Sequence, residues 1–186
     1  MVFFTRALKF LIALLLLLAV VLWFAAQRSD RGYIEEEITV DRPATAVFRW
    51  ITTDELLRRW TSSLTRLEKM DSSGPTVAAN SSYQIDEAIG TRTVSLKVRV
   101  LRIIPNQELE LSVNSANGPE RSFTCNAEFK LMPNGEYTRV IFSSRTAFHE
   151  LSGQVLEPVL TYAARGKVQE GLSRLKWMAE AESTSH

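Results

Sequence analysis

The feature that most constrains the fold is the last apolar-periodic stretch of the chain, residues 156–181, because every strand pattern before it needs an apolar partner. At 100° per residue, small and apolar side chains fall on one face of this stretch and polar ones on the other. The predicted inward face carries Leu156, Leu160, Ala163, Ala164, Val168, Gly171, Leu175 and Met178. Pro158 suits a first helical turn, where its missing N–H costs nothing. We therefore predict one unbroken amphipathic helix of about seven turns.

The middle of this inward face consists of small residues, namely Ala163, Ala164 and Gly171. A glycine inside a helix costs about 0.5 to 1 kcal/mol relative to alanine, so its presence needs a compensating reason. One reason is close packing of the helix on a sheet. The other is space for a ligand beneath the helix. The pattern itself is compatible with both.

An apolar run near the amino terminus, residues 10–26, predicts a membrane anchor. These seventeen residues carry no charge and approach the roughly 20 that span a bilayer. A cleaved signal peptide is the alternative, but Trp23 and Phe24 stand where a cleavage site needs small residues, and the run exceeds the usual apolar length of about 7 to 15. We predict an uncleaved single-pass transmembrane helix within residues 1–26.

The charges that flank this run set the expected orientation only weakly. Arg6 and Lys9 precede it, and Arg28 and Arg31 follow it. The amino terminus adds positive charge to the first side, and positive flanks stay in the cytoplasm. We therefore expect a membrane protein whose following domain lies on the extracytoplasmic, periplasmic side.

The charge balance of the remaining chain is close to neutral. Of the 22 basic residues, Arg6 and Lys9 lie before the run, which leaves 20 basic against 21 acidic residues. Such a domain has no electrostatic footprint for nucleic acid. The single cysteine, Cys125, excludes an intramolecular disulfide and a paired-cysteine metal or redox motif. With no other metal or nucleotide motif in the sequence, we predict no metal and no cofactor.

The rest of the chain predicts mainly strands that precede the closing helix. Residues 33–40 predict a first strand, and two short helices follow, the second opened by a capping box of Thr52 and Glu55. About six antiparallel strands come next, with clear alternation over residues 94–100 and 109–113. The predicted organisation is an anchor (1–26), a linker (27–32), a domain (33–182) and a tail (183–186).

This order predicts an α+β domain in which a curved antiparallel sheet wraps around one long helix. Its pieces are the run EITVDRPATAVFRWITTDELLRRW, the hairpin IPNQELEL, the PNG turn and the closing helix. In this order they resemble the START-like helix-grip superfamily, in particular the SRPBCC branch of polyketide cyclases, dehydrases and lipid-transport proteins. The resemblance covers Ile34 to about Ala181.

The resemblance implies a deep, mostly apolar cavity between the sheet and the closing helix, which holds lipids, polyketides or other hydrophobic molecules in this superfamily. The candidate ligand-binding residues are Trp60, Tyr83, Val98, Phe142, Leu160, Ala164, Val168 and Gly171. The alternative for the isolated aromatic residues is an ordinary place in the core.

Groups that could support catalysis are few. His149 beside Glu150 is typical of a solvated surface pair. Asp86 and Glu87 are adjacent strand residues, so only one of these carboxylates can face inward. Cys125 suits a small buried position. Strand arginines that could bind an acidic head group, or simply cover the sheet, are Arg99, Arg139 and Arg145.

The function predicted from the sequence is binding of a hydrophobic or lipid-like small molecule by a membrane-anchored, monomeric helix-grip domain without catalytic residues. Two other functions stay open. One is a cyclase- or dehydrase-like enzyme that acts on a hydrophobic substrate. The other is an interaction module whose cavity is filled by side chains.

Overall fold

The computed structural model describes residues 12, 14–16, 32–71, 74, 76–89, 92–115 and 123–182. The chain divides into two compact units, Met1–Arg31 and Gly32–His186. The predicted anchor lies outside the described residues except for 12 and 14–16, which are helical. Among the residues that are described, no helix combines the length and the apolar character needed to cross a bilayer.

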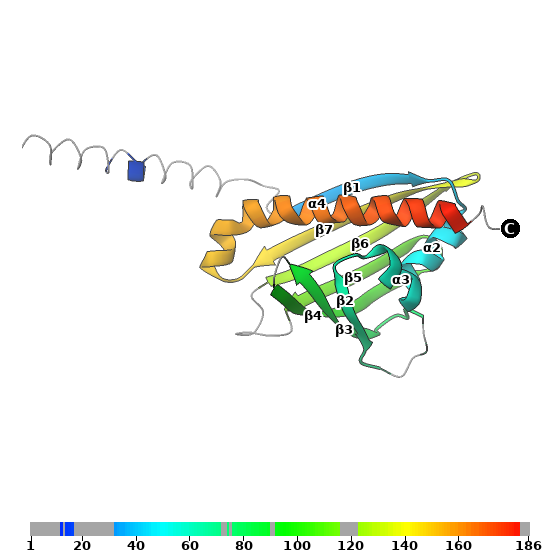
Figure 1. The fold of residues 1–186 in the computed structure, drawn as a ribbon, viewed down its shortest axis with the longest axis horizontal. Helices are drawn as coiled ribbons and strands as arrows, with labels where there is room; N and C mark the ends of the chain where they lie inside the picture. Colours follow the sequence, from blue (N-terminus) through cyan, green and yellow to red (C-terminus); the bar gives the residue numbers. More distant parts are fainter. Residues whose placement is uncertain are drawn as a thin grey trace, which may run out of the picture. The chain divides into compact units, whose positions relative to one another are not determined.

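A seven-stranded antiparallel sheet forms the body of the second unit (Figure 1). Its strands are β1 (Tyr33–Val40), β2 (Leu64–Lys69), β3 (Ser82–Ile89), β4 (Arg92–Ile104), β5 (Glu108–Ser115), β6 (Phe123–Asn134) and β7 (Tyr137–Phe148). Strands β2 to β7 form a meander in chain order, and β1 adds to the free edge of β7. The predicted α+β class, with an antiparallel sheet and a long C-terminal helix, is confirmed.

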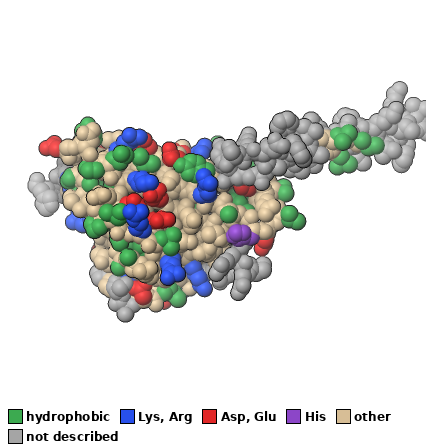
Figure 2. All heavy atoms as spheres, turned by 180° about the vertical axis from the view of Figure 1, so that it is seen from behind, with side chains coloured by type: hydrophobic (Ala, Val, Ile, Leu, Met, Phe, Trp, Pro, Cys, Tyr) green, Lys and Arg blue, Asp and Glu red, His purple; other side chains and the backbone are tan. Residues whose placement is uncertain are grey.

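The sheet has one apolar and one charged face, as side chains alternate along each strand. Leu131 and Val140 are paired across β6 and β7, and both are buried in the core. On the opposite face, the β6 neighbours Lys130 and Glu128 form an ion pair of 2.9 Å. Figure 2 shows basic and acidic side chains mixed on the side of the molecule seen from behind. The apolar face is therefore the one that the helices must cover.

Two short helices, α2 (Ala44–Thr52) and α3 (Asp54–Trp60), close one end of the apolar face. Val47 and Ile51 of α2 are fully buried. The predicted capping box is wrong, because the residue that precedes α3 is Thr53 and it makes no side-chain capping bond. The Thr52 hydroxyl instead donates to the Phe48 carbonyl at 2.7 Å, within the last turn of α2.

The closing helix, α4 (Leu151–Ala181), is longer than predicted. It begins five residues earlier, so Pro158 lies inside the helix rather than in its first turn. A proline there removes the bond to the carbonyl four residues before it and bends the helix. In Figure 1 the first turns of α4 indeed depart from the line of the remaining helix.

The face of α4 that packs on the domain agrees with the prediction in the second half of the helix, where Leu175, Val168 and Met178 face inward, and differs from it in the first half. Leu172, Leu175 and Ala179 are at most 2% exposed and join the core. Leu156 and Leu160 are 52% and 41% exposed, and Ala163 is exposed too. In the first half of α4, Leu156 and Leu160 therefore do not lie on the buried side of the helix. Glu157, the residue after Leu156, lies there instead.

Side-chain hydrogen bonds fix the C-terminal end of α4 to the start of the domain. Glu180 accepts a bond of 2.7 Å from the Asp41 backbone N–H. Glu182 accepts bonds from Arg49 at 2.5 Å and from the Trp50 indole at 3.0 Å. Desolvation opposes ionisation of Glu182, but these two donors outweigh it and lower the pKa of its carboxyl.

The domain begins at a glycine that no other residue can replace without strain. Gly32 has φ +62°, and a Cβ there would lie 2.1 Å from the Thr146 carbonyl oxygen. Its own carbonyl accepts a bond of 2.9 Å from the Thr146 N–H, and its N–H donates to Glu157 Oε1 at 2.7 Å. Gly32 thus connects β1, β7 and the first half of α4.

We expect Gly32→Ala to lower the free energy of unfolding by about 1 to 3 kcal/mol or more, because positive φ and the clash with Thr146 act together. Gly135→Ala is the matched control: Gly135 has φ +67°, but nothing lies within 4 Å of an added Cβ. Both variants place alanine at positive φ, so the difference between their melting temperatures reports the clash with Thr146 alone. Equal melting temperatures would contradict the close approach at Gly32.

Candidate functional site: a pocket under the closing helix

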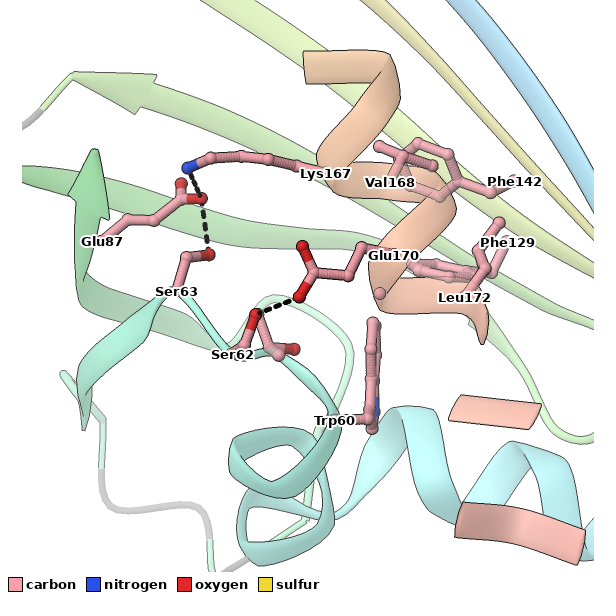
Figure 3. Close-up of a pocket in the computed structure, with 12 residues that line it drawn as sticks. Trp60, Ser62, Ser63, Glu87, Phe129, Phe142, Lys167, Val168, Glu170 and Leu172 are labelled. Atoms are coloured by element: carbon pink, nitrogen blue, oxygen red, sulfur yellow. Dashed lines mark hydrogen bonds and ion pairs between the residues drawn. The ribbon is translucent and has the colours of Figure 1, made fainter. Parts of the chain in front are cut away.

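A pocket of about 250 Å³ lies between α4, the end of α3 and the apolar face of the sheet (Figure 3). One side of its wall is the end of α3 and the segment that joins α3 to β2, and another side is α4. Strands β3, β6 and β7 supply the remainder. Its lining residues are Trp60, Thr61, Ser62, Ser63, Glu87, Phe129, Phe142, Lys167, Val168, Glu170, Gly171 and Leu172.

Three aromatic rings form the floor of the pocket. Trp60 and Phe129 meet edge to face with centroids 6.3 Å apart, and Phe129 meets Phe142 at 4.9 Å. Such edge-to-face pairs are favourable arrangements of aromatic quadrupoles. The Trp60 indole N–H donates to the Trp50 carbonyl at 3.0 Å, which satisfies its one polar atom. The floor therefore presents apolar ring surface only.

Gly171 shapes the pocket from the helix side. A Cβ at this position would meet only the Trp60 ring, with its nearest carbon at 3.4 Å, which is ordinary van der Waals distance. Gly171 therefore faces Trp60 of α3 and does not pack directly on a strand. Because glycine has no side chain, the space in front of the ring stays open.

Polar groups surround the mouth. Lys167 of α4 forms an ion pair of 2.9 Å with Glu87 of β3, whose Oε1 also accepts a bond of 2.7 Å from the Ser63 hydroxyl. The Ser62 hydroxyl donates to Glu170 at 3.3 Å. In Figure 3, Lys167 and Glu87 extend toward each other across the opening. The arrangement is an apolar interior with a polar, charged entrance.

Four of the eight predicted ligand-binding residues line this pocket: Trp60, Phe142, Val168 and Gly171. The other four do not. Tyr83 is buried in the core, and Val98, its partner on β4, packs against that core. Leu160 and Ala164 lie on the first half of α4, and Leu160 is exposed because the buried face is rotated away from it.

The sequence interpretation missed Phe129, Glu87 and Lys167 as pocket residues. Phe129 is the cross-strand partner of Phe142, so the strand alternation contained the signal. Glu87 does face the pocket side, while Asp86 accepts a bond of 2.5 Å from Ser95, as the opposite directions of adjacent strand residues require. Nothing in the sequence distinguished Lys167 from a solvated helix residue.

The remaining candidates for chemistry lie elsewhere. His149 is exposed and bonds to Thr124 at 3.0 Å, and Arg139 pairs with Glu37 on the surface. Arg145 lies over the Tyr33 ring, 5.5 Å from its centroid. Burial raises the pKa of the Cys125 thiol, which keeps it protonated and a weak nucleophile. Within the described residues, no three His, Cys, Asp or Glu side chains gather as metal ligands.

We expect Gly171→Ala to raise the free energy of unfolding by up to about 1 kcal/mol, since it adds helix propensity and the new methyl group fits in front of Trp60. Gly166→Ala is the matched control, because an added Cβ at Gly166 meets nothing within 4 Å. Thermal unfolding should show a similar gain in both. A lower melting temperature for Gly171→Ala alone would mean that Trp60 cannot accommodate the methyl group.

Solved structures with the same fold are numerous but distant in sequence. Protein TTHA0849 from Thermus thermophilus superposes with a TM-score of 0.65 at 18% identity, covering 81% of this chain and 99% of that one. Protein NE0264 from Nitrosomonas europaea gives 0.64 at 12% identity, over 84% and 99%. DynU16, a protein of the dynemicin biosynthetic locus, gives 0.58 at 15% identity, over 80% and 47%. At these identities, the likeness concerns the fold alone.

The family of the chain follows from its sequence. No functionally curated protein matches the chain significantly. Residues 32–180, however, match the family described as polyketide cyclase / dehydrase and lipid transport. This match covers the whole sheet and nearly all of α4, including every residue of the pocket. The chain belongs to the polyketide cyclase/dehydrase and lipid transport family.

Proposed function

We propose that the protein binds a hydrophobic or lipid-like small molecule in the pocket under α4. The observation that carries this proposal is the combination of a floor of three aromatic rings with a polar mouth. An amphipathic molecule suits it, with its apolar part on Trp60, Phe129 and Phe142 and its polar end near Lys167 and Glu87.

The size of the pocket limits which part of a ligand it takes. An apolar cavity of roughly 150 Å³ holds one benzene ring. At about 250 Å³, this pocket suits a ring system or a short length of chain rather than a whole long acyl chain. Burial at roughly 25 cal/mol per Å² supplies the affinity without a specific polar contact. A larger ligand requires α4 to move outward at Gly171.

Binding is favoured over the two other functions by the placement of polar groups. A cyclase- or dehydrase-like enzyme needs acid and base groups beside the reacting atoms. Here the carboxylate and the amine, Glu87 and Lys167, lie at the solvent-accessible mouth, whereas the buried floor is apolar. An interaction module with a filled cavity would have no such pocket.

The sequence adds an anchor to this proposal. The uncharged run of residues 10–26 supports a single membrane span, with the binding domain on the extracytoplasmic side. The domain would then sample ligands that partition into the bilayer. A monomeric protein fits this role, because the pocket is built from one chain.

The binding proposal is tested with Gly171→Leu, whose side chain would occupy the space in front of Trp60. Decanoic acid, titrated into the purified full chain and followed by calorimetry, should bind the unmutated protein and bind the variant at least about tenfold more weakly, a loss of 1.4 kcal/mol. Solvent extraction with mass spectrometry should release a hydrophobic molecule from the unmutated protein only.

Gly166→Leu is the control for this experiment, because position 166 faces open space on the same helix. It should bind decanoic acid as the unmutated chain does. Equal binding by both variants would exclude this pocket as the site. Absence of decanoate binding together with absence of any extracted molecule would refute the proposed function.

Membrane topology is tested separately by reporter fusions after His186. A reporter active only in the periplasm should give signal, and one active only in the cytoplasm should not, because the amino-terminal flank carries the extra positive charge. The reverse pattern would overturn the proposed side of the membrane and leave the pocket assignment unchanged.

A further inference from the structure

The first half of α4 exposes a row of large apolar side chains. Leu151 is 80% exposed, Val155 59%, Val159 66% and Tyr162 83%. At 100° per residue these four fall on one stripe, roughly opposite the buried side of the helix. Leu156 and Leu160, also exposed, flank the stripe. Contiguous exposed apolar surface of this kind marks an interaction site.

In this half of the helix the apolar side faces outward and the side with small and polar residues faces the domain. The side that faces the domain carries Gly153, Glu157 and Thr161, and a Cβ at Gly153 would lie 3.0 Å from the Phe148 ring. In the second half, the outward stripe continues with the polar residues Gln169 and Ser173. A helix in water normally turns its polar side outward. The first half departs from this rule along its whole outward stripe, whereas in the second half only Trp177, which is 68% exposed, does so among the large apolar residues.

Charge is absent from the exposed surface of the same segment. Between Leu151 and Ala164 the only Asp, Glu, Lys, Arg or His residue is Glu157, which is 9% exposed. Its Oε1 accepts bonds from the Gly32 N–H at 2.7 Å and from the Thr161 hydroxyl at 3.2 Å. The outward surface therefore has no charged group to desolvate if it enters an apolar medium.

The bond between Glu157 and Gly32 also determines how far this surface can be from a membrane. The apolar run ends at Ala26, and only residues 27–31 separate it from Gly32. Fully extended, these six steps span about 20 Å. Gly32 itself is held against the middle of the exposed segment. Because Gly32 contacts the side of α4 opposite the stripe, one helix diameter of about 10 Å must be added, and an anchored chain keeps the stripe within about 30 Å of the bilayer surface.

We infer that residues 151–162 dock onto the lipid bilayer surface as an interfacial helix. Leu151, Val155 and Val159 enter the acyl boundary, and Tyr162, with an apolar ring and a polar hydroxyl, lies at head-group level. This inference rests on the anchor proposed above. It deepens the binding function, because Lys167 at the pocket mouth is about 12 Å further along the helix than Val159.

A protein partner is less well matched to this surface. Protein interfaces carry about one hydrogen bond per 100 to 200 Å² and a polar rim. Between residues 151 and 164 the stripe has no exposed charged residue at its rim; Glu150 precedes the segment, and Arg165, which follows it, is already paired with Glu36 at 3.3 Å. A lipid surface requires no directional partner, so the apolar stripe and the short linker are sufficient for it.

The test measures the surroundings of a fluorophore on the full chain in vesicles. Cys125→Ala removes the native thiol, and Val159→Cys places a nitrobenzoxadiazole label on the stripe. Ser173→Cys is the control, on the same outward side about 21 Å further along α4. In vesicles of phosphatidylcholine and phosphatidylglycerol, the label at 159 should shift to shorter wavelength and be quenched by doxyl-labelled lipid. The label at 173 should remain in water.

Each other outcome overturns the inference and identifies what failed. A chain that resists alkaline extraction from vesicles but keeps the 159 label in water retains its anchor and refutes docking. A chain lost on alkaline extraction refutes the anchor and, with it, the argument for docking. A shift at 159 without quenching, accompanied by cross-linking between 159 positions, assigns the stripe to a second copy. Decanoate binding in detergent solution tests the pocket independently of all three.

Discussion

Burial of the second half of α4 on the apolar face of the sheet is the interaction on which the rest of the structure depends. Leu172, Leu175 and Ala179 are the helix residues that enter the core, opposite strand residues such as Val140 and Leu131. A sheet with one apolar face cannot remain open to water, and the two short helices cover only one end of it. The pocket exists because the Leu175 side chain fills the space between α4 and the sheet, whereas Gly171, without a side chain, leaves space beneath the helix.

The strands could be predicted from the sequence because alternation is a local signal. All seven were expected, and the family resemblance, carried by their order, agrees with the family match of residues 32–180. The predicted helix face was right in the second half of α4, where Leu175 enters the core, and wrong in the first half, where Leu156 and Leu160 were assigned to the inward side. Periodicity assumes that apolar residues face the core, and in the first half of α4 they face outward.

Only half of the predicted ligand-binding residues line the pocket. Trp60, Phe142, Val168 and Gly171 could be found because aromatic and small residues on facing elements suggest a cavity. The ion pair of Glu87 and Lys167 could not be found, since it joins residues 80 positions apart in the sequence that meet only across the mouth of the folded pocket. Thr52 shows the converse error: a local capping motif was present, but the Phe48 carbonyl was the nearer partner.

The two ends of α4 are held differently, and this difference bears on how the pocket can open. Glu180 and Glu182 bond to the backbone of Asp41 and to Arg49 and Trp50, and the core residues lie beside them. Before the pocket, no α4 residue enters the hydrophobic core, and the helix is attached by the buried bond from the Gly32 N–H to Glu157 and by surface pairs such as Arg165–Glu36, which contribute about 0 to 1 kcal/mol each. Outward movement of α4 on the side of Pro158, where the backbone ladder already lacks one bond, leaves the core residues in place but requires the bond between Glu157 and Gly32 to break. A ligand too large for the pocket would enter by displacing this half of the helix, while the core-bound half keeps the domain folded.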